Sequence, residues 1–279
     1  MIVQTVFTIA ALTLREVARR RVLRALAVLT TILLALSAWG FSRIDAEFGG
    51  LTTGEALVAS TIVLNLVMFG LSLIAALGTA FLAGPTLSGE IESGIALAVL
   101  ARPIRRFAVL LGKWLGLVTF GSGFVILAGL AQLLIVRATT GYWPPQPVTG
   151  LALLAAQTTA LLTLGLLLST AISPMASGII AVGLFGATWV AGVVGGVGDA
   201  LDNESVARIG TVSRMILPTD GLWRGAMHSF QDPILLSPQL IGHPLVSEAP
   251  LTGAYLAWAG LWVALILGLA GISFQRRDL

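Results

Sequence analysis

Paired acids and arginines lie close together in one short segment of this 279-residue chain. Glu90 and Glu92 come just before Ser93-Gly94, a pair that favours a break in a helix. Residues 95–101 then form an apolar stretch, which Arg102-Pro103 ends because the residue before a proline is pushed out of the α region. A short apolar helix between acids and arginines can dock on a soluble partner through ion pairs and apolar contact.

A second interpretation of this segment stays open on physical grounds alone. Arginines beside a membrane, such as Arg105 and Arg106, are attracted to anionic lipid head groups without any protein partner. That attraction does not explain the paired acids. Residues 107–114 predict an interfacial helix that leads back into the bilayer, with Lys113 reaching toward water at its edge.

ATP hydrolysis by this chain is not expected. A P-loop has the pattern GxxxxGK followed by Ser or Thr, because backbone N–H groups cradle the phosphates and the hydroxyl holds Mg²⁺. The sole Gly-Lys pair, Gly112-Lys113, is followed by Trp114, and Phe107 stands where the first glycine should be. The sequence therefore predicts no ATP-binding loop in this chain.

Other catalytic chemistry also lacks its residues. The chain has no cysteine, and its two histidines, His228 and His243, fall in a polar region without an HExxH pattern. Serine or aspartate chemistry inside the membrane would need buried partners that the sequence does not supply. We expect no catalytic residue, no metal ligand and no cofactor in this chain.

The composition indicates the elements that must position these residues. The chain is 57% hydrophobic and only 10% charged, whereas soluble proteins contain about 25% charged residues. Such a sequence cannot cover the surface of a soluble domain, so a disordered tail, a coiled coil and a cytosolic enzyme are excluded. It predicts an all-α, polytopic membrane protein.

Six stretches are apolar and long enough to cross a bilayer. They are residues 25–42, 56–83, 114–136, 151–172, 175–198 and 253–274. Ser173-Pro174 divides the fourth from the fifth, because proline ends or kinks a helix. We expect one transmembrane domain over residues 1–279, with a loop at 84–113 and a large region on the other side at 199–252.

Polar residues are scarce inside these stretches, and no ionisable residue lies well inside any of them. Ion-coupled carriers place acids, histidines or arginines at membrane depth, so a secondary carrier is disfavoured. The amides in these stretches are Asn65, Gln132 and Gln157, and one interpretation is that they line a pathway through the membrane. Hydrogen bonds between helices are the simpler role for them.

The charges predict the orientation. With both termini in the cytoplasm, eleven of the 16 basic residues and four of the 13 acids fall inside, for a net +7 there and −4 outside. This bias follows the positive-inside rule, so the basic residues set topology and no nucleic-acid partner is expected. Residues 1–14, with Arg15, Arg19, Arg20 and Arg21 at or just beyond their end, predict an amphipathic helix on the membrane surface, in preference to a buried extra span.

Three motifs in order carry a resemblance to a known family. They are Gly89-Glu90-x-Glu92-Ser93-Gly94, Leu100-x-Arg102-Pro103-x-x-Arg106 and Leu110-Leu111-Gly112-Lys113. Their order and spacing resemble the first cytoplasmic loop of type 2 ABC transporter permeases, NosY-like branch. The arginine-rich amphipathic helix, the six spans and the large outer region also resemble that family. Ile95 departs from it, because the family has Thr or Ser there.

The resemblance implies that residues 90–106 form a coupling helix that seats in a cytosolic ATPase subunit. Glu90 and Glu92 would meet basic groups there, and Ser93-Gly94 would supply the turn. Arg102, Pro103 and Arg106 would orient the helix that returns to the membrane. ATP and Mg²⁺ would belong to the partner, and two permease subunits, identical or related, would form the pathway in the plasma (inner) membrane.

The outer region predicts two short helices. Val206, Ile209, Val212 and Ile216 recur at helical spacing, and Pro218 follows them. Residues 221–230 predict a second helix with Trp223 as an anchor at the membrane interface. This region would serve as an outer gate or a docking surface for an extracytoplasmic accessory protein, or simply cover the membrane surface.

Glycine pairs at GxxxG spacing are as frequent as chance predicts in a chain with 32 glycines. Gly112 with Gly116 and Gly192 with Gly196 therefore receive no role, while Gly260, Ala264 and Gly268 predict a packing face. We expect the permease subunit of an ATP-driven exporter that is itself no enzyme. The alternative is a mechanical or sensory subunit that transmits ATPase motion to an outer partner without moving a substrate.

Overall fold

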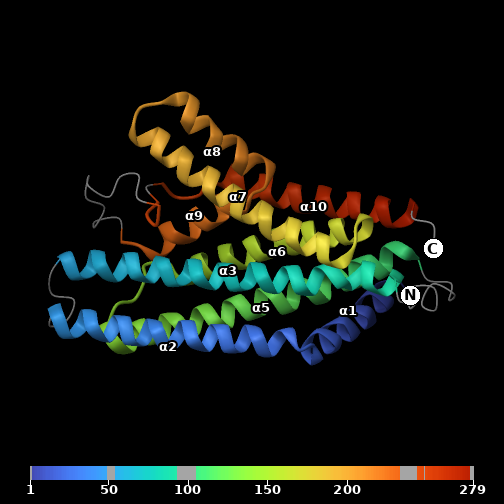
Figure 1. Ribbon diagram of the computed structural model, residues 1–279, viewed down its shortest axis with the longest axis horizontal. Coiled ribbons are helices and arrows are strands. Elements are labelled where there is room, and N and C mark those ends of the chain that lie inside the picture. Colours follow the sequence, from blue (N-terminus) through green and yellow to red (C-terminus); the bar gives the residue numbers. More distant parts are fainter. Residues whose placement is uncertain (1, 49–53, 93–104, 233–243, 248, 277–279) are drawn as a thin grey trace.

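The chain folds as a bundle of long helices, as a computed structural model shows (Figure 1). The structure describes residues 2–48, 54–92, 105–232, 244–247 and 249–276, and these contain nine helices and no strand. The helices are α1 (Ile2–Arg19), α2 (Val22–Phe48), α3 (Gly54–Glu92), α5 (Arg106–Thr140), α6 (Pro147–Ala171), α7 (Pro174–Ala200), α8 (Glu204–Ile216), α9 (Thr219–Phe230) and α10 (Gly253–Arg276).

Six of the described helices are long and apolar enough to cross a membrane, which confirms the six predicted spans. They correspond to Val22–Arg43, Val58–Gly89, Arg106–Thr140, Pro147–Ala171, Pro174–Ala200 and Gly253–Arg276. The fourth and fifth separate where predicted, since α6 ends at Ala171 and Pro174 occupies the first turn of α7. The architecture is that of a multi-pass membrane protein.

Two of these helices are longer than the sequence predicts. α3 continues through Pro85 to Glu92, where the sequence predicts a loop from residue 84. Side chains bond the carbonyls around the proline: the Thr86 hydroxyl donates to Leu82 O, and the Ser88 hydroxyl donates to Gly84 O at 2.7 Å. Both are bonds from a hydroxyl to the carbonyl one turn earlier, within the turns around Pro85.

The predicted interfacial helix at 107–114 is instead the start of α5. No glycine–proline pair or other strong breaker separates Arg106 from Trp114, so one helix runs unbroken from Arg106 to Thr140. It ends at Gly141, whose φ of 74° is left-handed and accessible to glycine.

The two ends of the bundle differ. One end, here named the terminal end, holds the start of α1, the end of α3, the start of α5 and the end of α10 (Figure 1). The other, the opposite end, holds α8 and α9. α8 folds back along the outer part of α7, and this α7–α8 hairpin extends past the bundle (Figure 1).

Backbone contact between small residues makes the α7–α8 hairpin. A Cβ on Gly195 would lie 2.7 Å from Gly210 Cα, and one on Gly198 would lie 2.4 Å from Ala207 N. Asp202 turns the chain with a φ of 51°, and the Asn203 side chain caps α8 by accepting from Val206 N at 3.2 Å. The apolar face predicted for α8 is solvent- or lipid-facing in the isolated chain, with Ile216 67% exposed.

The second short helix of the outer region, α9, lies inside the bundle. It packs against α6, where a Cβ on Gly150 would lie 2.3 Å from the Phe230 ring. The Tyr142 hydroxyl donates to Phe230 O at 2.8 Å, and burial raises the pKa of that hydroxyl, which keeps it protonated. α9 is therefore part of the core at the opposite end.

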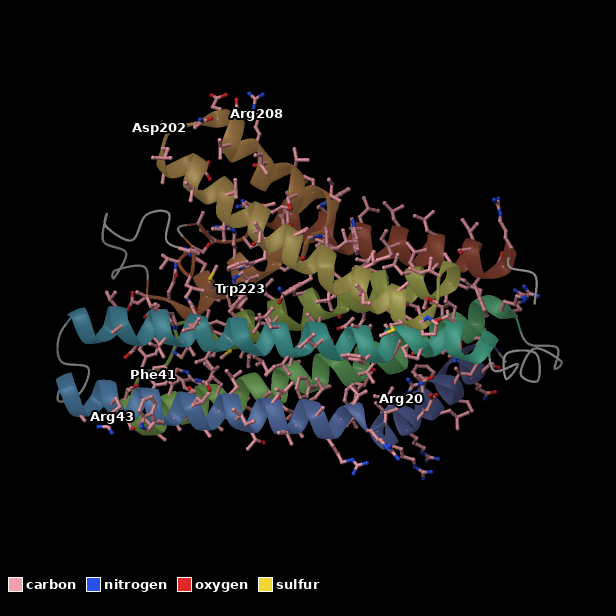
Figure 2. The ribbon with its side chains drawn as sticks, viewed as in Figure 1. Arg20, Phe41, Arg43, Asp202, Arg208 and Trp223 are labelled. Carbon is pink, nitrogen blue, oxygen red and sulfur yellow. The ribbon has the colours of Figure 1, made fainter. Side chains whose placement is uncertain are left out.

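The interfacial role predicted for Trp223 is wrong. Trp223 is 1% exposed and lies beside Phe69, with ring centroids 5.5 Å apart (Figure 2). Apolar residues at i, i+1, i+4 and i+8 give α9 one wide apolar face, and that face turns toward α6 and not toward lipid. Exposed tryptophans at this end are elsewhere: Trp39 and Trp143 each lie beside an arginine, Arg43 and Arg137.

Candidate functional site

The candidate coupling site lies at the terminal end, where α3 and α5 flank residues 93–104. Glu90 and Glu92 belong to the last turn of α3, and nothing further is described of their side chains. The predicted site residues Ser93, Gly94, Arg102 and Pro103 fall outside the described residues. Arg106 is described and begins α5. The site is therefore built from the helices that hold its two ends.

The sequence predicts that Lys113 reaches toward water. In the structure its side chain instead lies buried against α3. Its side chain is 5% exposed, and Nζ donates to Thr86 O at 3.0 Å. The carbonyl belongs to the turn that follows Pro85, and a buried ammonium must have such partners to offset its desolvation. Because α5 starts earlier than predicted, Lys113 sits in its second turn and faces the helix beside it. This contact joins α3 to α5.

Arg106 joins α5 to the end of α10. Its Nη1 donates to Gln275 O at 3.2 Å and to Phe274 O at 3.5 Å. These are carbonyls of the last turn of α10, which have no partner within that helix and carry the negative end of its dipole. The contact fixes the start of α5 to the end of α10, and the orienting role of Arg106 stays a prediction.

Glycines hold α1 against α5. A Cβ on Gly112 would lie 2.6 Å from Ile9 Cβ and 2.9 Å from Val6 O, and one on Gly116 would lie 2.8 Å from Ala10 O. Gly112 and Gly116 form a GxxxG pair that was expected to have no particular role. They are the contact surface between the first helix and the third span. By contrast, a Cβ on Gly260 or Gly268 would meet nothing within 4 Å, so the packing face predicted on α10 has no partner among the described residues of this chain.

α1 has one face on α5 and one face free. Val17 is 2% exposed, whereas Val3 and Phe7 are more than 60% exposed. Arg20 leaves α1 at its bend into α2 and pairs with Glu16 one turn earlier (Figure 2). The free apolar face and the arginines are the features from which a position on the membrane surface is predicted.

The three amides of the spans all hydrogen-bond to other parts of the chain. Gln132 of α5 donates to Ser37 Oγ of α2 at 2.6 Å, and Gln157 of α6 accepts from Ser72 Oγ of α3 at 2.9 Å. Asn65 Nδ2 donates to Leu245 O at 2.8 Å, a backbone atom of the segment before α10. Each amide therefore has a positioning role, and the Asn65 bond ties α3 to the opposite end.

A buried ion network at the opposite end was not predicted. Asp220 Oδ2 accepts from Arg214 Nε and from Arg224 Nε, each at 3.1 Å, and the Asp220 side chain is 1% exposed. Arg224 Nη2 also donates to Gly192 O at 2.6 Å. The signal was the i, i+4 spacing of Asp220 and Arg224 within an otherwise apolar helix. The network joins α7, α8 and α9.

Comparison with known proteins adds no assignment. No family model matches the chain, and no curated protein sequence matches it. The resemblance to type 2 ABC permeases consequently stays a prediction that rests on the motifs at residues 89–113.

Proposed function

We propose that the chain is the transmembrane subunit of an ATP-driven ABC permease that acts as an exporter. It would lie in the plasma membrane with its terminal end in the cytoplasm. A separate cytosolic ATPase would bind residues 90–106 and supply ATP and Mg²⁺, and a second permease subunit would complete the pathway. The chain itself would catalyse no reaction.

The observation that carries this proposal is the way four helices are tied together at the terminal end, where α3 ends and α5 begins. Lys113 bonds α3 to α5, Arg106 bonds α5 to α10, and Gly112 with Gly116 seats α1 on α5. A force applied to the connection between α3 and α5 would therefore displace α1 and α10 as well. This is the property required of an element that converts closure of an ATPase into movement of a helix bundle.

The experiment measures the rate of ATP hydrolysis by the complex. The full chain carries an affinity tag, and the complex is purified from native membranes through that tag. Glu92→Lys reverses the charge of one coupling acid and is compared with Glu16→Lys, which reverses an exposed acid in the last turn of α1, predicted to lie on the same side of the membrane. We expect the complex to hydrolyse ATP and the Glu92 variant to lose at least about tenfold of that rate, because a reversed charge at an ionic interface costs several kcal/mol. A complex without ATPase activity, or equal rates in both variants, would refute the proposal.

A specific observation favours a second function. The α7–α8 hairpin extends past the bundle and exposes Ile209, Val212 and Ile216 along one side of α8 (Figure 1). An exposed apolar face on a protruding element fits a mechanical subunit that passes ATPase motion to an extracytoplasmic protein. Val212→Asp would then abolish association with that protein while leaving ATP hydrolysis intact. For a permease that needs no outer partner, the same variant would change neither.

A further inference from the structure

The opposite end contains a cavity of about 390 Å³ that the proposed function does not use. It lies between the end of α7, the α8–α9 corner, residues 244–247 and 249–252, and the start of α10. The polar or charged side chains on its wall belong to Asp199, Arg214, Arg224, Ser247, Thr252 and Tyr255. Its volume falls within the range of small-molecule sites, about 300–1,000 Å³.

The two arginines on this wall keep part of their hydrogen-bonding capacity. Arg214 uses Nε on Asp220, and within the part of the chain that the structure describes neither of its Nη nitrogens makes a hydrogen bond. Arg224 uses Nε on the same carboxylate and Nη2 on Gly192 O. Both side chains are partly exposed, at 25% and 18%, and both line the cavity. Hydrogen-bond donors therefore remain on two residues of the cavity wall.

The charge of the cluster favours an anion. Two guanidinium groups share one buried carboxylate, so one positive charge is left over at the inner wall. Asp199 is the acid on the lining, and it is exposed near the end of α7. Guanidinium groups bind phosphate and carboxylate oxygens with charge-assisted bonds. Two of them on different helices suit a tetrahedral group, since each can bind a different oxygen.

The position of the cavity suggests the source of the anion. It lies where α7 ends and α10 begins, both of which are long and apolar enough to span a membrane. Lipid phosphates lie at the level where spans end. Val193, Val246 and Leu251 give the same cavity apolar walls.

We propose that this cavity binds the phosphate group of a phospholipid or of a small phosphorylated compound, held by Arg214 and Arg224. Arg214 supplies its Nη edge and Arg224 supplies Nη1, while Asp220 holds both guanidinium groups in place. The apolar walls accommodate the glycerol or acyl portion of the ligand. This site does not depend on coupling to an ATPase.

Binding is measured by calorimetry on the full chain in an uncharged detergent. The probes are a short-chain phosphatidylglycerol, inorganic phosphate, and a monoacylglycerol that lacks phosphate. Arg214→Gln removes the free donors, and Arg208→Gln is the matched control, because it removes an exposed arginine of the same helix that pairs only with Glu204 within the described residues. We expect at least about a tenfold weaker affinity in the Arg214 variant, the loss that follows from charge-assisted bonds.

A second variant tests the site without removing any member of the ion network. A Cβ on Gly196 would lie 3.7 Å from Arg224 Nη2, an ordinary contact, so Gly196→Asp places a carboxylate inside the cavity as a competitor. Gly196→Ala is its control. We expect Gly196→Asp to abolish binding, Gly196→Ala to retain it, and Asp199→Asn to strengthen it by removing a repelling charge.

The outcomes separate the sources. Binding of phosphatidylglycerol alone identifies a lipid head group, and binding of inorganic phosphate as well identifies the phosphate itself as sufficient. Both support the proposal if Arg214→Gln or Gly196→Asp weakens them. It is overturned if the wild-type chain binds neither probe, if the monoacylglycerol binds equally well, or if these variants bind as their controls do.

Discussion

The terminal end and the opposite end of the bundle use charge in different ways. At the terminal end Lys113 and Arg106 donate to backbone carbonyls of neighbouring helices, and Gly112 with Gly116 lets two backbones meet. At the opposite end one buried carboxylate, Asp220, collects two arginines and leaves an open cavity beside them. In our proposals the tight backbone contact would transmit displacement, whereas the polar cavity would hold a ligand.

The two ends of the bundle therefore hold their helices together by different contacts. The terminal end ties α1, α3, α5 and α10 into one unit, with donors satisfied by main-chain atoms. The opposite end holds α7, α8 and α9 by side chains that form an ion network. α3, which Lys113 ties to α5 at the terminal end, also has a contact at the opposite end, where Asn65 donates to Leu245 O. The predictions below test each region in turn.

The largest effect is expected where a buried charge loses its partner. Asp220→Asn keeps the shape of the side chain but leaves Arg214 and Arg224 without a counter-ion, which should lower the free energy of unfolding by about 3 kcal/mol. Unfolding in mixed micelles with increasing SDS measures it. Glu204→Gln, which breaks an exposed pair with Arg208, is the control and should cost at most about 0.5 kcal/mol. Equal losses would show that the network does not stabilise the opposite end.

A smaller loss is expected from overpacking at the terminal end. Gly112→Val would push α1 away from α5, since a Cβ there already meets Ile9 and Val6, and should cost about 2 kcal/mol. Protease sensitivity of α1 reports its detachment. Gly123→Val is the control on the same helix, because a Cβ at Gly123 meets nothing within 4 Å. If protease cleaves α1 at the same rate in both variants, the glycine contact does not hold α1 against α5.

Lys113 gives the next effect. Lys113→Met keeps the length of the side chain and removes its bond to Thr86 O, which should cost about 1.5 kcal/mol, the value of a hydrogen bond from a charged donor. The same SDS titration measures it. Arg105→Met, at an exposed residue just before α5, should change stability little. A stabilised Lys113 variant would mean that desolvation of the ammonium outweighs its bonds.

The smallest effect is expected within the spans. Ser72→Ala removes the hydroxyl that donates to Gln157, and such bonds in membranes contribute on average about 0.6 kcal/mol. A loss above 2 kcal/mol would give the amide a larger role than joining two helices.

The sequence predicts the spans well because hydropathy and length decide them almost alone. The break at Ser173-Pro174 and the amphipathic α8 were also predicted correctly, each from a local signal. The end of α3 was not, because Pro85 is a helix breaker in water but lies inside this membrane helix. The start of α5 was not, because no strong breaker divides the predicted interfacial helix from the span that follows it.

Contacts between helices were harder to predict. The periodicity of α9 predicts an apolar face but not whether lipid or protein covers it, so Trp223 was misplaced. Likewise a GxxxG pair does not reveal its partner: Gly112 meets α1, whereas Gly260 and Gly268 meet no described side chain. Asp220 and Arg224 meet through their i, i+4 spacing on α9, but Arg214 joins them only because α8 folds onto α9.

The central claim is that residues 90–106 contact a cytosolic subunit, and cysteine labelling tests it most directly. The chain has no native cysteine, so Glu92→Cys and Glu16→Cys each report one position, and the two positions are predicted to lie on the same side of the membrane. Their rates of maleimide labelling are compared in inside-out native vesicles before and after an alkaline wash that strips peripheral proteins. We predict labelling at residue 92 to become at least about tenfold faster after stripping, as expected for a buried interface position, with no change at residue 16. Equal rates at residue 92 before and after stripping would contradict the account.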